Sequence, residues 1–353
     1  MPPLPYEPSL RSLRLARVGL TVRLRAPLAA RELAGPALRS AFGVGLRTRV
    51  CATGAPTCAG CPLRTACAYG VLFDPAWPGG HAPRWASGGQ DAPRPLVLEA
   101  SPEAKGDLSP GALCRFTAVL IGRAVAYAPY IPFVFARLGA EGRGPGRPAP
   151  YTLEAVEAVG ADGALAPLPP GALPPALSGA DLLTQPAPPP GRLALVFRTP
   201  LRLEERGVPV EPTFPLLVRA LLRRLVAFAA LHGDEPLEAF DERPLLEAAA
   251  GIATDTGALR WVDGTRRSVR QGRDVPLGGY VGPLVIEGDL APFLPLLAAG
   301  QWLHVGKGAV MGHGGYTMDP APTAPVGGAA MRPGIPGRMA APPTARPSLA
   351  PPA

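Results

Sequence analysis

The order of strand-like and helix-like segments is the same on both sides of a stretch rich in proline and glycine at residues 160–191. Apolar residues alternate with other residues from Val18 to Leu24, the period of a half-buried strand, and residues 35–50 carry the i, i+4 apolar spacing of a helix. Two further strands, a helix and a strand follow. This is the order of a ferredoxin-like (RRM-like) unit, so the sequence predicts an α+β protein with two such domains in tandem.

Composition indicates the domain boundaries. The chain contains 43 glycines and 49 prolines in 353 residues, and many of them lie in residues 160–191 and 319–353. Such composition is typical of linkers and disordered tails. We therefore predict an N-terminal domain at residues 1–159, a Pro/Gly-rich linker at 160–191, a C-terminal domain at 192–318 and a disordered tail at 319–353.

Residues 303–316, with the sequence LHVGKGAVMGHGGY, gather five glycines around one lysine. Glycine reaches positive φ and leaves its N–H uncovered, so a polyanion can approach the main chain. The glycine spacing differs from that of mononucleotide loops, and the segment follows a helix instead of opening one. The sequence therefore predicts contact with the phosphates of a longer chain, and the alternative is a flexible surface turn. The predicted contact residues are Gly306, Lys307, Gly308, Gly312, Gly314 and Gly315.

The charge of the chain favours an acidic partner, either nucleic acid or a membrane surface. The formal net charge is +8 at pH 7. Of 35 basic residues only Lys105 and Lys307 are lysines, and the flexible ammonium of Lys307 can reach a phosphate from a loop. A second, weaker Gly/Arg loop surrounds Arg143. No apolar run approaches the ~20 residues that span a bilayer, and no signal-peptide pattern is present, so we expect a cytoplasmic protein.

Four cysteines lie within seventeen residues, in the spacing Cys-x6-Cys-x2-Cys-x5-Cys. In a reducing compartment, such a group is more often a metal site than a pair of disulfides. A [4Fe–4S] cluster also takes four thiolates, and unligated cysteines are the remaining alternative. We predict a structural zinc, because four cysteine ligands leave no open position for catalysis. The predicted ligands are Cys51, Cys58, Cys61 and Cys67.

Several segments together resemble a known family. In the C-terminal half these are FRTP at 197–200, ALLRRL at 220–225, TRRSVRQ at 265–271, GGYVGPLVIEGDL at 278–290 and the glycine-rich segment at 303–316; in the N-terminal half they are ALRSAFGVGLR, the cysteine segment and LGAEGRGPGR. They resemble the CRISPR-associated endoribonuclease of the RAMP superfamily that processes precursor crRNA. The resemblance implies two ferredoxin-like domains and binding of CRISPR repeat RNA, with Arg143, Arg266 and Arg267 among the contacts.

The resemblance also implies one cut per repeat, by attack of a 2′-hydroxyl on the adjacent phosphate to give a 2′,3′-cyclic phosphate, without a catalytic metal. That reaction needs a base that titrates near neutrality. In much of the family the catalytic histidine lies on or near the first helix of the N-terminal domain, and this chain has no histidine between Ala34 and Val50. We predict His304 and His232 as catalytic candidates, with Lys307 as phosphate clamp, and Tyr316, Arg266 and Arg267 as the next candidates.

Three alternatives remain at this stage. His232 falls on the apolar side of the helix at 214–232, near its C-terminus, where a purely structural histidine is also favoured. The whole chain is also compatible with a non-catalytic RAMP subunit that binds crRNA in a CRISPR interference complex, with other effector subunits as partners. A redox regulator built on the cysteines is a more distant alternative, because it leaves the arginines and the glycine-rich segment unexplained.

Overall fold

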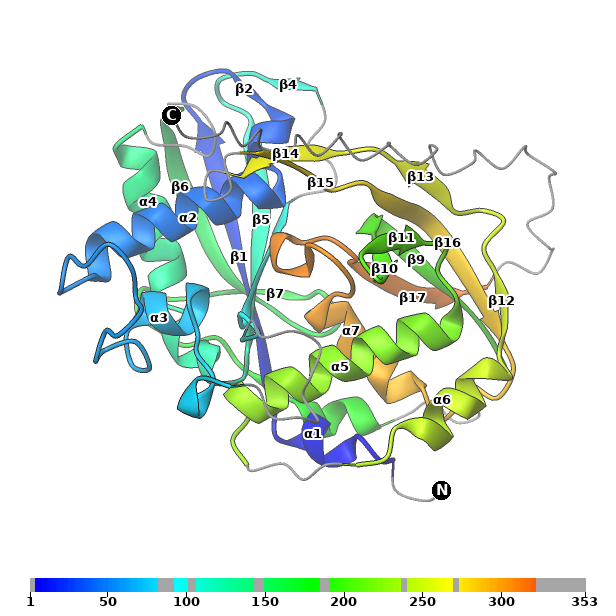
Figure 1. Cartoon of the computed structure of the whole chain (residues 1–353). Coiled ribbons are helices and arrows are strands. Elements are labelled where there is room, and N and C mark those ends of the chain that lie inside the picture. The colour runs from blue at the N-terminus through cyan, green and yellow to red at the C-terminus, as the bar shows by residue number, and fades with distance from the viewer. Residues whose placement is uncertain are drawn as a thin grey trace, which may run out of the picture.

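A computed structural model gives the fold of residues 4–81, 92–100, 106–142, 149–184, 191–235, 240–268 and 273–321, which are the described residues. Figure 1 shows two sheets, one from each half of the chain, with the glycine-rich segment between them in orange. None of the helices in these residues has both the length and the apolar character that crossing a bilayer requires.

The N-terminal unit is an antiparallel sheet in the order β3-β5-β1-β6, with two helices on one face. This is the strand order of a ferredoxin-like fold, as predicted. Its main elements are β1 (Arg14–Leu24), α2 (Gly35–Val50), β3 (Leu96–Ala100), β5 (Leu113–Ile121), α4 (Tyr130–Ala140) and β6 (Tyr151–Val159). Smaller elements are α1 (Glu7–Arg11), β2 (Leu28–Ala29), η1 (Ala30–Leu33), α3 (Ala68–Phe73), η2 (Pro78–Gly80), β4 (Asp107–Leu108) and η4 (Gly122–Tyr127).

The C-terminal unit repeats this topology in the order β12-β16-β9-β17, and β13 also pairs with β16. Its main elements are β9 (Arg192–Leu201), α5 (Phe214–His232), β12 (Ala253–Asp255), β13 (Arg260–Val262), β16 (Gly279–Glu287), α7 (Leu294–Leu303) and β17 (Tyr316–Pro320). Two separate hairpins, a helix and a 3-10 turn complete it: β10 (Leu203–Glu205) with β11 (Val208–Val210), β14 (Thr265–Ser268) with β15 (Arg273–Pro276), α6 (Arg243–Ala250) and η6 (Ala309–Met311).

Residues 160–191, which composition indicated as a linker, contribute structure to the N-terminal unit. β7 (Leu165–Pro167) extends the sheet by pairing with β6, and β8 (Leu177–Ser178) pairs with the start of β1. η5 (Gly179–Leu183) follows and is capped by Ser178, whose side chain accepts a hydrogen bond from Ala180 N. The predicted tail begins inside β17, and its residues 322–353 lie outside the described residues.

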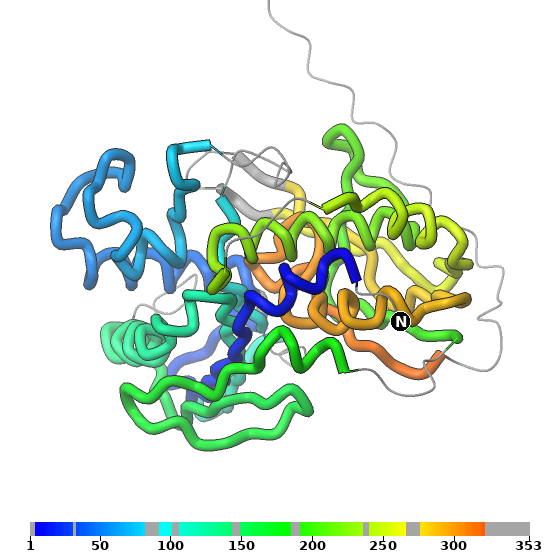
Figure 2. Tube along the Cα trace, turned by 90° about the horizontal axis from the view of Figure 1, so that it is seen from below, coloured from blue at the N-terminus to red at the C-terminus, as the bar shows by residue number. Residues whose placement is uncertain are grey.

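The strand β1 is buried on both faces because the C-terminal unit covers the face that α2 and α4 leave open. Val18 and Leu20 pack in the core under α2 and α4, whereas Leu15 joins the larger core of the C-terminal unit. Figure 2 shows α1, in dark blue, lying against the C-terminal half. There Tyr6 is fully buried and donates a hydrogen bond to Pro292 O (2.8 Å). The N-terminal unit therefore has a core of its own on one face of its sheet and contributes residues of the other face to the core of the C-terminal unit.

Candidate nucleic-acid interface

The glycine-rich segment leaves the end of α7, turns through η6 and enters β17. Its glycines at 306, 308, 312 and 314 all have positive φ, between 64° and 83°, a region that strongly favours glycine. The predicted conformational role of these glycines is thus present in the structure.

Two parts of the segment differ in exposure. Gly312, Gly314 and Gly315 are buried, and the N–H groups of Gly314 and Gly315 donate to Pro200 O and Thr199 Oγ1 (3.0 and 2.8 Å). Gly306 and Gly308 are half-buried, and no hydrogen bond from either of their N–H groups is present among the described residues. The part of the main chain that a phosphate can approach is therefore Gly306–Gly308.

The buried part of the segment packs closely against the N-terminal unit. A Cβ atom on Gly312 would lie 2.7 Å from Leu98 O of β3, and one on Gly35, the first residue of α2, would overlap the carbonyl oxygen of Met311. Real Cβ atoms do not approach backbone oxygens this closely. The glycines at 35 and 312 are therefore required by contact between the two units, which sequence reasoning did not foresee.

Lys307 is the most exposed residue of the segment, with 61 % of its side chain accessible. Its Nζ lies 3.5 Å from Glu204 Oε2, while Glu204 Oε1 accepts a hydrogen bond from Arg202 Nε (2.8 Å). The main-chain N–H of Lys307 donates to Arg202 O (2.9 Å) and holds the segment on the end of β9. Lys307 thus presents its charge at the surface, next to a carboxylate that is already shared.

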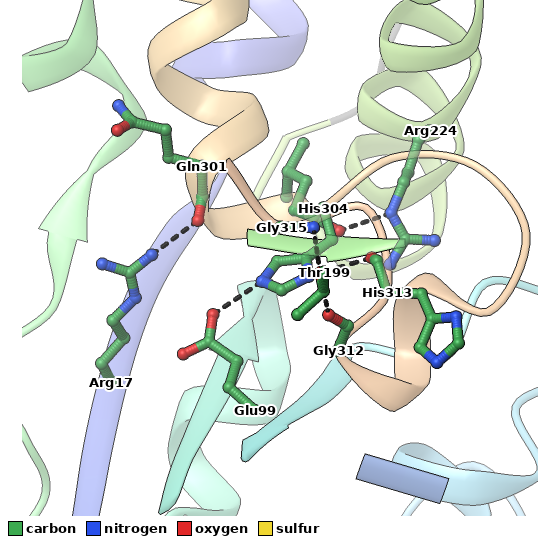
Figure 3. Close-up of polar contacts among 10 residues, drawn as sticks. Arg17, Glu99, Thr199, Arg224, Gln301, His304, Gly312, His313 and Gly315 are labelled. Carbon is green, nitrogen blue, oxygen red and sulfur yellow. Dashed lines mark hydrogen bonds and ion pairs between the residues drawn. The ribbon is translucent and has the colours of Figure 1, made fainter. Parts of the chain in front are cut away.

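His304 occupies the point where α7 ends. Its backbone has φ 57° and ψ 168°, a region that only glycine adopts without strain. Its ring is 3 % exposed, and Figure 3 shows it pointing across the boundary between the units toward Glu99 of β3. His304 Nε2 lies 2.6 Å from Glu99 Oε1, and His304 Nδ1 lies 3.1 Å from His313 O. Both partners are acceptors, so the doubly protonated ring, which donates twice, satisfies both contacts.

Glu99 belongs to a small group of charges at this boundary. Burial opposes ionisation of the carboxyl, but the hydrogen bond and charge of His304, together with Arg17, outweigh it and lower the pKa of Glu99. Arg17 of β1 donates to Gln301 O (2.6 Å), and Arg224 of α5 donates to Leu303 O (2.6 Å). One arginine from each unit therefore satisfies a free carbonyl at the C-terminus of α7.

His232 is fully buried at the end of α5 and also contacts the N-terminal unit. Its Nε2 lies 2.7 Å from Pro93 O, and its Nδ1 lies 3.1 Å from Arg123 Nε. Nε2 therefore donates and Nδ1 accepts, which is the neutral ring. Burial, with a smaller contribution from the charge of Arg123, lowers the pKa of His232 to about 4.

The four cysteines predicted as metal ligands line one cavity of about 250 Å³ near α3. None of them forms a disulfide. The hydrogen bond with Thr53 lowers the pKa of Cys51, whereas burial and the charge of Asp74 raise the pKa of Cys58. The donor set fits zinc or an iron–sulfur cluster in kind, but no three metal-binding side chains among the described residues stand in a ligating arrangement. A bound metal would require residues 51–67 to close further.

The three arginines predicted to contact RNA lie wholly or partly outside the described residues. Arg143 lies outside the described residues. Arg266 and Arg267 lie on β14, one strand of a two-stranded hairpin, and their side chains are outside the described part. Glu99, Thr199 and Glu204 were not foreseen, because their contacts with His304, Gly312 and Lys307 join distant parts of the chain. Only Glu99 carried a signal, as the one carboxylate in the otherwise apolar strand LVLEA.

The protein thus belongs to the class with two tandem ferredoxin-like units and a glycine-rich segment at their junction. Residues 195–316 match the family of the CRISPR-associated endoribonuclease Cas6, so the C-terminal unit is a domain of that family. Residues 13–170 match the N-terminal domain family AF_1859_N. Comparison with curated protein sequences gives no match.

Solved structures agree in fold. A product complex of the Thermus thermophilus Cas6 TTHB231 aligns with a TM-score of 0.53 at 16 % identity, covering 86 % of this chain and 99 % of that one. A partial Cas6-RT-Cas1–Cas2 complex aligns with a TM-score of 0.54 at 14 % identity, covering 88 % of this chain and 46 % of that one. At these identities the similarity establishes the fold alone.

Proposed function

We propose that this chain binds CRISPR repeat RNA and cuts precursor crRNA once in each repeat. The observation that carries the proposal is the exposed Gly306–Gly308 turn with Lys307 at its centre, in a domain of the Cas6 family and at the junction of two ferredoxin-like units. The free N–H groups and the ammonium offer a phosphate both hydrogen bonds and charge.

The proposed reaction is internal transfer at the RNA phosphate. The 2′-oxygen forms a bond to phosphorus as the bond from phosphorus to the 5′-oxygen breaks, leaving a 2′,3′-cyclic phosphate and a free 5′-hydroxyl. A base takes the proton of the 2′-hydroxyl and an acid supplies one to the 5′-oxygen. Lys307 stabilises the charge that develops on the phosphate oxygens. No metal ion is needed to balance these steps.

The identity of the base stays a prediction for His304 and His232. In the conformation described, both nitrogens of each ring are engaged in contacts between the units. Both ring nitrogens of His304 donate in these contacts, so the ring would have to leave Glu99 or His313 O and lose a proton before it could accept one. We propose that His304 positions the glycine-rich segment and that His232 joins α5 to the N-terminal unit, so that a catalytic role for either would require a rearrangement.

The second candidate function is a non-catalytic subunit that binds crRNA within a CRISPR interference complex. The observation that favours it is the same engagement of His304 and His232, which leaves neither of these rings presented to the surface. The RNA-binding surface would be shared by both functions, so binding alone does not distinguish them.

The test is cleavage of a synthetic repeat RNA under single-turnover conditions in EDTA. We expect one cut per repeat, with a 2′,3′-cyclic phosphate on the upstream product. Lys307→Ala should weaken binding and flatten its salt dependence by about one phosphate contact. Tight binding without any cut, with or without divalent metal ions, would favour the crRNA-binding subunit, and the lack of binding would overturn both functions.

A further inference from the structure

A cleft of about 760 Å³ opens on the C-terminal unit beside Lys307, between the β10–β11 hairpin and α5. Of the described residues, five cationic side chains and two carboxylates, Glu204 and Glu205, line it. The cations are Arg202, Arg206, Arg219, Arg223 and Lys307. Aliphatic residues such as Leu203 and Leu216 also line it. This cleft lies apart from the boundary between the units, where His304 and Glu99 meet.

The arginines of the cleft differ in their pairing. Arg202 is bound to Glu204, but no hydrogen bond or ion pair of Arg206, Arg219 or Arg223 is present in the part of the chain that the structure describes. Arg219 and Arg223 lie one turn apart on α5 and so project from the same face of the helix. Like charges at this spacing destabilise a helix slightly unless an anion lies between them.

Glu204 connects the cleft to the glycine-rich segment. Its two carboxylate oxygens face Arg202 Nε and Lys307 Nζ, at 2.8 and 3.5 Å. Arg202 is 10 % exposed, whereas Lys307 is 61 % exposed, so the contact with Arg202 is the fixed one and the contact with Lys307 is the weaker. A phosphate has the charge and the oxygen atoms to replace this carboxylate beside Lys307.

The lining defines the class of ligand. A groove of guanidinium groups suits phosphate oxygens, which arginine binds in a bidentate manner. Among the residues that the structure describes, no aromatic side chain lines the cleft, and these walls therefore offer no stacking platform of the kind that single-stranded bases use. Contacts to phosphates position a nucleic acid without reading its sequence. The chemistry of the cleft thus matches an RNA backbone and gives no reason to expect base recognition.

We propose that this cleft holds backbone phosphates of the bound RNA next to the Gly306–Gly308 turn, and that Glu204 keeps Lys307 in place until a phosphate displaces its carboxylate. The proposal rests on the proposed RNA-binding function and assigns a second anchoring site to it. It predicts that RNA follows the face of α5 away from the glycine-rich segment.

The test is the affinity of the full chain for a repeat RNA, measured over a range of salt concentrations. The double variant Arg219→Ala/Arg223→Ala should bind RNA at least about tenfold more weakly near 0.1 M salt. The slope of log affinity against log salt concentration should fall by the amount expected for about two phosphate contacts. The matched control is Arg25→Ala/Arg137→Ala, which removes the same charge from exposed positions on the N-terminal unit. Circular dichroism of each variant verifies folding.

Glu204→Gln tests the displacement separately. If the carboxylate competes with RNA for Lys307, this variant should bind RNA several-fold more tightly at low salt. Equal or weaker binding would overturn the role of Glu204. If the wild type binds RNA and the α5 variant loses no more affinity than the control, the cleft is not an RNA site and the proposed function stands. If the wild type does not bind RNA, this inference fails together with the proposed function.

Discussion

At the scale of single residues, the contact between His304 and Glu99 combines strain with charge. A histidine held at φ 57° and ψ 168° is costly, by about 1–3 kcal/mol for such a backbone. The cost is offset by two ring contacts, one of them to a carboxylate of the other unit. Strain of this kind is concentrated at functional sites. The residue therefore fixes where the glycine-rich segment begins.

Breaking this contact should destabilise the protein. We expect Glu99→Gln and His304→Gln each to lower the free energy of unfolding by about 1–3 kcal/mol, because each leaves a buried polar partner less well satisfied. The double variant should cost less than the sum of the two. Urea unfolding measures all three, and Asp241→Asn, at an exposed pair, is the control. Additive losses would show that the pair is not coupled.

Acidification should destabilise the protein through His232. Its pKa is about 4 in the folded protein and 6.5 as an ordinary histidine. Between these values the unfolded chain binds a proton that the folded chain does not, so stability falls as the pH falls from about 6.5 to 4, by at most about 3 kcal/mol. The lowered pKa of Glu99 gives a loss in the same direction at more acid pH.

His232→Gln should flatten this pH dependence, since glutamine does not titrate. The control is His81→Gln, at an exposed histidine. The measurement is the midpoint of urea unfolding from pH 4 to 8. If the urea midpoint of His232→Gln still falls between pH 6.5 and 4 as it does in the wild type, another group is responsible.

At the scale of elements, the cysteine segment is the part of the N-terminal unit that the RNA-binding function does not explain. Cys51 follows the last residue of α2, Cys67 precedes α3, and Cys58 and Cys61 lie in the turn between them. A metal bound by all four would fasten together two helices that already pack against each other, for example through Phe42 and Phe73. We propose a structural zinc, or an iron–sulfur cluster, at this place.

Protein purified anaerobically should therefore carry about one equivalent of zinc, or a brown chromophore if the group is iron–sulfur. Elemental analysis and absorption spectra measure this. Cys51→Ser should lower the melting temperature and the metal content, while RNA affinity per folded molecule stays near that of the wild type. Cys114→Ser, at a buried cysteine of β5 outside the segment, should keep the metal. Protein with neither metal would contradict the proposal.

At the scale of the whole molecule, the two ferredoxin-like units are not independent. Tyr6, Leu10 and Leu13, at the start of the chain, are buried in the core of the C-terminal unit. Arg17, Glu99 and Arg123 make polar contacts to the same unit. A shared core of this kind favours a single cooperative transition.

Unfolding in urea should accordingly give one transition, whether it is followed by circular dichroism or by tryptophan fluorescence. Leu10→Ala should shift both signals together, at a cost of about 2–5 kcal/mol, because it leaves a cavity in the core where α1 packs against α5 and η5. Leu63→Ala, at an exposed leucine, is the control. Two separate transitions, with only one of them moved by Leu10→Ala, would show that the units unfold independently.

The sequence by itself determined the order of elements and the nature of the glycine-rich segment. Both follow from local rules, since apolar periodicity sets strand and helix, and glycine density sets the backbone of the loop. The tandem ferredoxin-like fold is confirmed on these grounds.

Only the tertiary structure decided what the site residues do. His304 and Glu99 are 205 residues apart, and Gly35 meets Met311 through the packing of two units. No local pattern encodes such contacts, because they depend on which faces of the two sheets are buried together. The same packing made part of the glycine-rich segment a buried junction and left Gly306–Gly308 as its exposed turn.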